Sequence, residues 1–199
     1  QVLYPPVPSI HYEKKPEKLI ERPRKNLVVT ISRFSPGKGL EKIPYIASLT
    51  DSKIRFAIIG RLHHKDTLTS LQKLTKKLNL TDRIKFFPDA SRTEIKEMLK
   101  NAKVYLHTMV GEHFGISIVE AMAMGCTPIV HDSGGPKEFV PHHFRYKNVQ
   151  DAAEKIENAT IGWSPSRAIE TIKIAERFRE ETFAAKFKTL FENYIKSKR

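Results

Sequence analysis

The stretch that decides the fold is residues 111–131, which read GEHFGISIVEAMAMGCTPIVH. Residues 116–124 are apolar on nearly all sides and stand before Gly125, which predicts a buried helix closed by a glycine. Residues 127–131 then predict a strand, with Pro128 near its start. A helix and a strand that are both apolar throughout belong at the centre of a sheet covered by helices.

The same alternation of extended and helical patterns continues in both directions along the chain. Near-continuous apolar runs predict buried strands, and apolar residues at three- and four-residue steps predict helices. Ser91 and Glu94 form a capping box that starts one of these helices. The fold class that follows is α/β: a single Rossmann-like domain whose parallel sheet has helices on both faces. The predicted strands are 26–32, 54–60, 83–87, 103–107, 127–131 and 144–147, and the predicted helices are 40–49, 65–78, 91–100, 116–124, 149–158, one that begins at Ser164 and Pro165, and a terminal amphipathic helix over 183–195.

The composition limits the classes of partner. Of 199 residues, 35 are Lys or Arg and 22 are Asp or Glu, so the surface favours polyanions such as phosphates, anionic membranes or nucleic acid. The one cysteine, Cys126, has no second cysteine to pair with and sits in an apolar stretch, which is typical of a buried structural thiol. No apolar run approaches the roughly 20 residues that span a bilayer, so we expect any membrane contact to be peripheral.

Two carboxylates flank the start of the helix at 116–124. From Phe114 to Val130, Glu120 is the only charged residue, and an ionised carboxylate there is costly unless a partner or a ligand hydroxyl hydrogen-bonds to it. Gly115 precedes the helix and lets a ligand approach the free N–H groups of the first turn, which suits a phosphate. Glu112 lies in the preceding loop, so both carboxylates are placed to accept hydrogen bonds from the hydroxyls of a sugar or a ribose. A buried helix with a glycine entry and a salt-bridged glutamate is the alternative for this segment.

A second group of polar residues follows the first strand. Residues 32–39 read SRFSPGKG, and they lie at the carboxyl edge, where a doubly wound sheet binds its ligands. Arg33 and Lys38, on a turn held by proline and glycines, suit a diphosphate, whose negative charge they would neutralise. The segment matches neither the three-glycine dinucleotide fingerprint nor the P-loop. Taken alone, such a segment is more often a basic turn.

Together the two segments resemble the retaining glycosyltransferases of family 4, which have two Rossmann-like domains facing a cleft, the GT-B type. The resemblance covers nearly the whole chain and implies that Arg33 and Lys38 bind the donor diphosphate. It implies that Glu112 contacts the transferred sugar and that Glu120, after seven intervening residues, contacts the ribose. The residues in catalytic positions would be Glu112, Arg33 and Lys38. The donor-binding residues would be Arg33, Lys38, Ala90, Glu112, His113, Phe114, Gly115, Ile116 and Glu120, with the base near Asp89 and Ala90.

Within this family, residues 112–116 and 131–137 look most like mannosyltransferases that use GDP-mannose to extend lipid-linked oligosaccharides. We therefore expect transfer of a hexose, mannose from GDP-mannose, to a lipid-linked or glycan acceptor with retention at the anomeric carbon. Residue spacing does not select guanine over uracil or mannose over glucose, so a UDP-sugar-dependent glucosyl- or N-acetylhexosaminyl-transferase is an alternative. A non-enzymatic basic module that binds nucleotides or nucleic acid is another. Aromatic residues are not interleaved with the basic clusters as nucleic-acid stacking requires, so no nucleic-acid partner is expected.

The resemblance also implies how the chain is organised. We expect an interdomain linker at 1–24, a nucleotide-sugar-binding domain at 25–180, and a terminal helix at 181–199 that crosses back to an amino-terminal acceptor-binding domain preceding Gln1. Such a fragment would be inactive alone. No Asp-x-Asp pair occurs and the adjacent histidines lack further ligands, so we expect neither a cofactor nor a metal. A cytoplasmic location, peripheral on the cytoplasmic face of a membrane, fits the same resemblance.

Overall fold

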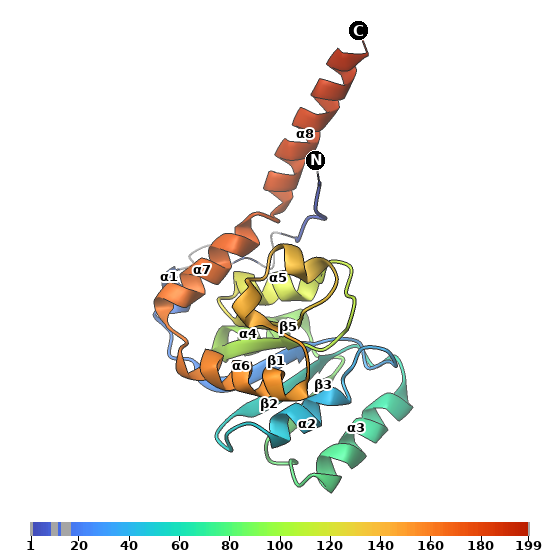
Figure 1. The fold of residues 1–199 in the computed structure, drawn as a ribbon, viewed down its shortest axis with the longest axis vertical. Coiled ribbons are helices and arrows are strands. Elements are labelled where there is room, and N and C mark those ends of the chain that lie inside the picture. Colours follow the sequence, from blue (N-terminus) through green and yellow to red (C-terminus); the bar gives the residue numbers. More distant parts are fainter. Residues whose placement is uncertain (1, 9–11, 13–16, 199) are drawn as a thin grey trace.

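The described residues form one six-stranded parallel sheet with the strand order β3-β2-β1-β4-β5-β6 (Figure 1). A computed structural model describes residues 2–8, 12 and 17–198, so part of the predicted linker, at 1, 9–11 and 13–16, lies outside the described residues. The strands confirm the predicted α/β fold class and lie within one or two residues of their predicted bounds. They are β1 (Lys25–Ile31), β2 (Arg55–Gly60), β3 (Ile84–Pro88), β4 (Ala102–His107), β5 (Thr127–His131) and β6 (Arg145–Tyr146).

Helices connect successive strands, so the strands run parallel. The short pieces η2 and η3 are 3₁₀ helices that lie between β5 and β6. The helices are α1 (Glu17–Ile20), α2 (Lys42–Ser48), α3 (Lys65–Lys77), α4 (Arg92–Asn101), α5 (Ile116–Ala123), η2 (Gly135–Glu138), η3 (His142–Phe144), α6 (Val149–Ile161), α7 (Pro165–Glu176) and α8 (Glu180–Ser197).

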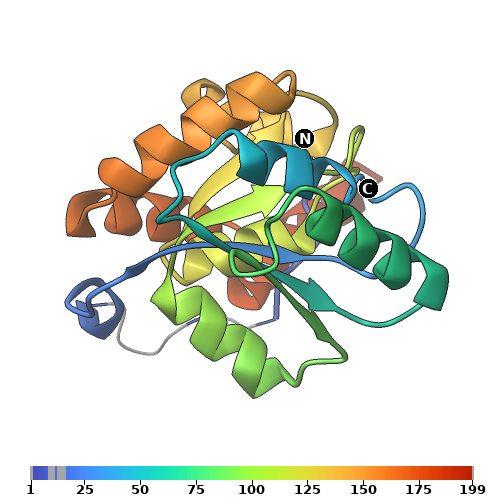
Figure 2. The same ribbon diagram turned by 90° about the horizontal axis from the view of Figure 1, so that it is seen from below.

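The direction of each crossover places its helix on one face of the sheet. The connection β1-α2-β2 steps toward one edge of the sheet and β4-α5-β5 steps toward the other. Because such crossovers are right-handed, α2 and α5 lie on opposite faces. α2 packs with α6 on one face and α5 packs with α7 on the other (Figure 2). The strand order reverses between β1 and β4, and a doubly wound sheet binds ligands outside the carboxyl ends of its strands at that point.

Several helix ends follow the predicted local chemistry. The Ser91 hydroxyl accepts from the Glu94 N–H at 3.3 Å, and the Ser91 N–H donates to the Glu94 carboxylate at 2.7 Å, which confirms the capping box. Gly125 follows α5 with φ +76°, as expected of a glycine that ends a helix. The helix predicted at 149–158 continues to Ile161, because its last turn still contributes buried side chains to the core.

Four aromatic side chains pack together beside the start of α5. The Phe114 ring lies 5.4 Å from Phe139 and 5.2 Å from Phe178 between ring centroids. Tyr4, from the predicted linker, stacks on Phe114 at 6.1 Å, and the Val7 N–H donates to the Phe178 carbonyl at 2.7 Å. The amino-terminal segment and the end of α7 therefore meet against the loop that precedes α5.

The terminal helix α8 projects away from the sheet (Figure 1). No side chain of its described residues is buried, and Phe187, Phe191 and Tyr194 are each more than half exposed. This confirms the predicted terminal amphipathic helix. Its return to an amino-terminal domain, like the domain boundaries at 24 and 180, stays a prediction.

Candidate functional site

The loop after β1 is locked onto the end of β4, across the point where the strand order reverses. Gly39 has φ +70°, and a Cβ on it would stand 2.5 Å from the Thr108 carbonyl oxygen, so only glycine fits there. The Thr108 hydroxyl donates to the Lys38 carbonyl at 2.9 Å. The Lys38 ammonium lies 3.1 Å from the Met109 sulfur. These contacts direct the positive charge of Lys38 toward the loop that leads into α5.

Glu112 is held in that loop by groups on both sides of its carboxylate. Oε2 lies 3.2 Å from Nε2 of His107, the last residue of β4, and Oε1 accepts from the His113 N–H at 3.0 Å. These partners lower the pKa of Glu112 from its ordinary value to about 2: the His107 contact is the largest cause, burial opposes it, and the positive charge of Lys38 adds to it. The carboxylate is therefore ionised and oriented before any ligand arrives.

The turn after β5 closes on the backbone of the same loop. The Gly135 N–H donates to the Glu112 carbonyl at 2.8 Å, and a Cβ on Gly134 would stand 2.2 Å from that oxygen. The Ser133 hydroxyl accepts from the Gly111 N–H at 2.8 Å. Two adjacent glycines let the turn approach this closely, and it fixes the loop that carries Glu112.

The start of α5 is open to a ligand. Gly115 adopts φ +88°, and the first bond of the helix runs from the Ile118 N–H to the Gly115 carbonyl at 2.9 Å. The N–H groups of Ile116 and Ser117 therefore precede the first intrahelical bond, where the helix dipole favours an anion. The Tyr105 hydroxyl lies 2.8 Å from the Ser117 hydroxyl and 3.2 Å from the carbonyl of Ile31, which ties this turn to the end of β1.

Two adjoining cavities extend from the carboxyl edge along the face that carries α4. One, of about 400 Å³, contains Arg33 and Ala90, and the other, of about 500 Å³, contains Glu120 between α4 and α5. They share Ile31 and Ile95. Burial raises the pKa of Glu120 above its ordinary value, and the positive charge of Arg92 in the same cavity opposes the shift. The role of Glu120 in binding a ligand hydroxyl stays a prediction.

The strand ends around the smaller cavity are bound to one another. Asp89 has φ +54°, its N–H donates to the Gly60 carbonyl, and its Oδ1 accepts from the Leu62 N–H, both at 2.9 Å. A Cβ on Gly60 would stand 1.9 Å from the Ser32 carbonyl oxygen. The main chain beside Ala90 is thus held in place by the neighbouring strands.

The predicted site residues fall into two groups on this edge. Lys38 and Glu112 lie with Phe114, Gly115 and Ile116 around the start of α5, whereas Arg33, Ala90 and Glu120 line the adjoining cavities. The His113 side chain is exposed. Sequence reasoning missed His107, Ser117 and the Gly134–Gly135 turn as parts of the site. A histidine as the last residue of an apolar strand was the one available signal for His107.

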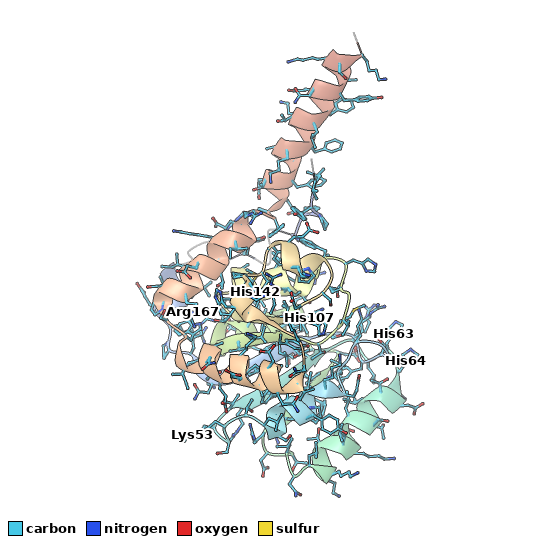
Figure 3. The ribbon with its side chains drawn as sticks, in the orientation of Figure 1. Lys53, His63, His64, His107, His142 and Arg167 are labelled. Carbon is cyan, nitrogen blue, oxygen red and sulfur yellow. The ribbon has the colours of Figure 1, made fainter. Side chains whose placement is uncertain are left out.

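The two pairs of adjacent histidines lie at the surface. His63, His64, His142 and His143 are exposed, whereas His107 lies within the body of the domain (Figure 3). In the part of the chain that the structure describes, no group of three or more His, Cys, Asp or Glu side chains is arranged to hold a metal ion. None of the helices in that part has the length and hydrophobicity needed to cross a membrane.

Glu112→Gln is expected to lower the free energy of unfolding at neutral pH but not near pH 2. The folded-state pKa of about 2 lies below the ordinary value, so the ionised carboxylate contributes stability that is present above pH 4.5 and is lost as the pH falls toward 2. Such a shift corresponds to about 3 kcal/mol, which solvent screening of this partly exposed pair reduces to about 1–2 kcal/mol. Urea unfolding of both proteins across this range measures the difference, with the exposed Glu154→Gln as the control. A difference independent of pH would contradict the expectation.

The family model and the curated relatives that match this chain are all described as glycosyltransferases. A family model described as "Glycosyl transferases group 1" matches residues 11–195. The chain is 28% identical to the GDP-Man:Man(3)GlcNAc(2)-PP-Dol alpha-1,2-mannosyltransferase of Dictyostelium discoideum, over 98% of this chain and 42% of that protein. Proteins of the same name from Neurospora crassa and Homo sapiens are 31% and 30% identical, over 94% and 86% of this chain and 37% and 39% of their own lengths. The chain thus spans about two fifths of the length of these curated relatives.

Solved structures share the fold. Alr3699/HepE of Anabaena in complex with UDP and glucose aligns with a TM-score of 0.82 at 22% identity, over 97% of this chain and 57% of that one. Sucrose-phosphate synthase from Thermosynechococcus elongatus aligns with a TM-score of 0.81 at 17% identity, over 99% of this chain and 53% of that one. At these identities the likeness extends to the fold alone.

Proposed function

Because the chain belongs to the group 1 glycosyl transferases, we propose that it is the donor-binding half of an enzyme that transfers mannose from GDP-mannose to a lipid-linked oligosaccharide. The names of the relatives support this choice of donor and acceptor. All three curated relatives described above are mannosyltransferases that use GDP-mannose and a dolichol-linked acceptor. The alternative of a nucleic-acid-binding module finds no support among them.

The observation that carries the proposal is the convergence at the start of α5. Lys38 comes from the loop after β1, whereas Glu112 and the N–H groups of the first turn of α5 follow one another along the chain, and these two segments meet at the carboxyl edge. A positive ammonium and a helix terminus suit a diphosphate, and an ionised carboxylate suits the hydroxyls of a sugar. When the bond between the sugar and the diphosphate breaks, Lys38, Arg33 and the helix amides would offset the charge that develops on the leaving group.

The adjoining cavities suit the nucleoside. A ribose beside Ile31 would present its hydroxyls to Glu120, and the base would lie against the main chain of Asp89 and Ala90. Hydrogen bonds from the ribose would then offset the cost of burying the Glu120 charge.

The proposal extends to the rest of the reaction. An amino-terminal domain would hold the lipid-linked acceptor, and α8 would cross back to it through its exposed aromatic face. The protein would work at the cytoplasmic face of a membrane. Leaving-group stabilisation by Arg33, Lys38 and α5 requires no metal ion, so none is proposed.

Calorimetric titration of the chain with GDP-mannose, GDP, UDP and a short oligonucleotide tests the proposal. We expect GDP-mannose and GDP to bind more tightly than UDP, and the oligonucleotide to bind weakly. Tight, salt-sensitive oligonucleotide binding without diphosphate binding would overturn the enzyme assignment. Tighter binding of UDP than of GDP would overturn the choice of donor.

Glu120→Gln is expected to weaken GDP binding about tenfold without unfolding the domain, because a neutral amide accepts a weaker hydrogen bond from the ribose than a carboxylate does. The fold should survive, since burial already disfavours the charged form. Glu97→Gln is the matched control, because Glu97 lines the same cavity and pairs with Arg22 and Lys100 instead. Unchanged GDP affinity in Glu120→Gln would remove this residue from the site.

A further inference from the structure

The side chain of His107 is buried in the body of the domain. It ends β4, where it pairs in register with Val130, and only 6% of the residue is exposed. The hydroxyl of Tyr146 donates to its carbonyl at 3.1 Å, so its main chain is held as well. Buried polar groups in proteins are almost always hydrogen-bonded, and burial without a partner is costly. A histidine in this position therefore requires a partner for its ring.

The partner is the carboxylate of Glu112. Nε2 of His107 lies 3.2 Å from Glu112 Oε2, within ion-pair distance, and among the residues that the structure describes this buried atom makes no hydrogen bond. The two side chains are 7% and 18% exposed, so the contact is only partly shielded from water. Nε2 carries a proton in the protonated form and in the neutral Nε2–H tautomer, so in both forms the contact brings an N–H group close to a carboxylate oxygen.

The other contacts of Glu112 do not fix its carboxylate relative to the sheet, and the contact with His107 does. The Gly135 N–H fixes the main chain of Glu112, and the His113 N–H fixes Oε1. The His113 donor belongs to the same loop and moves with it, whereas His107 belongs to the sheet. The contact between His107 and Oε2 thus fixes the orientation of the carboxylate relative to the sheet.

We propose that His107 is a positioning residue, which holds the Glu112 carboxylate in the orientation in which it accepts hydrogen bonds from the hydroxyls of the donor sugar. The inference rests on the proposed function, because it assigns the sugar of the donor to Glu112. A carboxylate held in advance loses less rotational freedom on binding, so sugar recognition is stronger. The nucleotide part of the donor does not depend on this contact, because Arg33 and Glu120 lie in the adjoining cavities.

Two amide substitutions separate positioning from simple occupancy of space. Glutamine places its amide nitrogen near the position of the histidine Nε2, whereas asparagine is one bond shorter and leaves Oε2 without a donor. The measured quantity is the ratio of the dissociation constants of GDP and GDP-mannose, which reports the contribution of the sugar. We expect His107→Asn to reduce this ratio about tenfold, with GDP affinity unchanged, and His107→Gln to restore most of it. In a Glu112→Gln background, His107→Asn should cause no further loss.

Three results would contradict the positioning role of His107. A wild-type ratio in His107→Asn, an equal loss in His107→Gln, or a parallel loss of GDP affinity and melting temperature in both variants overturns the positioning role. If these variants fail while the wild-type chain binds GDP-mannose more tightly than GDP, the proposed function stands and only this inference falls. If the wild-type chain binds neither ligand, the proposed function falls and the inference falls with it.

Discussion

Lys38→Met is expected to weaken the binding of GDP to this chain about 100-fold. A hydrogen bond to a charged group contributes about 1.5–3 kcal/mol, and a tenfold change in affinity corresponds to about 1.4 kcal/mol. The Lys38 ammonium is partly buried beside Met109, so water screens it less than it screens an exposed lysine. Methionine has nearly the same length, so the substitution removes the ammonium with its contact to the Met109 sulfur and little else. Calorimetric titration with GDP measures the change.

The matched control for this change is Lys42→Met. Lys42 is the first residue of α2 and lines a different groove, with Tyr45 and His131. We expect its GDP affinity to equal that of the wild-type chain. An equal loss in both variants would mean that net charge, and not the placement of Lys38, controls binding. Unchanged affinity in Lys38→Met would place the diphosphate elsewhere.

Gly135→Ala is expected to lower the free energy of unfolding by about 3 kcal/mol or more and to abolish measurable donor binding. A Cβ at this position would stand 1.8 Å from the carbonyl oxygen of His113, a backbone atom that has no room to withdraw. The turn must therefore move away, which breaks the hydrogen bond from the Gly135 N–H to the Glu112 carbonyl. Since that bond fixes the loop that carries Glu112, both the fold and the site are affected. Urea unfolding and titration with GDP-mannose measure the two effects.

Gly162→Ala provides the comparison for steric cost. Gly162 has φ −84°, a value open to any residue, and a Cβ there would stand 2.8 Å from the end of the flexible Arg167 side chain and 3.0 Å from the Asn158 carbonyl oxygen, a much milder approach than at Gly135. We expect a change below about 1 kcal/mol, because that side chain can shift. If the two alanine variants lose equal stability, the close approach of Gly135 to the loop is not the cause.

The α/β fold could be predicted from local chemistry because its elements carry their own signals. The helix at 116–123 is apolar apart from Ser117 and Glu120 and is closed by Gly125 soon after its end, and Ser91 with Glu94 marks the start of α4. Where prediction and structure differ, tertiary packing is the reason. The last turn of α6 continues beyond Asn158 because the sheet buries Ala159 and Thr160.

The site residues that could be predicted together are those that lie close to one another in the sequence. Glu112, Gly115 and Glu120 lie within one loop and the helix after it, so spacing alone placed them together. Arg33 and Lys38 follow β1, and the carboxyl ends of parallel strands share one edge. The division between the start of α5 and the adjoining cavities was not foreseen, because it depends on how far each loop reaches across that edge.

Local patterns along the chain specify the succession of strands and helices, the edge of the sheet at which the candidate site lies, and the residue types suited to a diphosphate and to sugar hydroxyls. These follow from local periodicity and from charge, which neighbours along the chain decide. Which groups hold Glu112 depends on the tertiary structure, since the His107 ring lies against its carboxylate from the end of the preceding strand, β4, and the Gly135 N–H reaches its carbonyl from the turn after β5. Such contacts depend on distances in space of about 3 Å between segments that are separate in the chain, and no pattern along the sequence measures those distances.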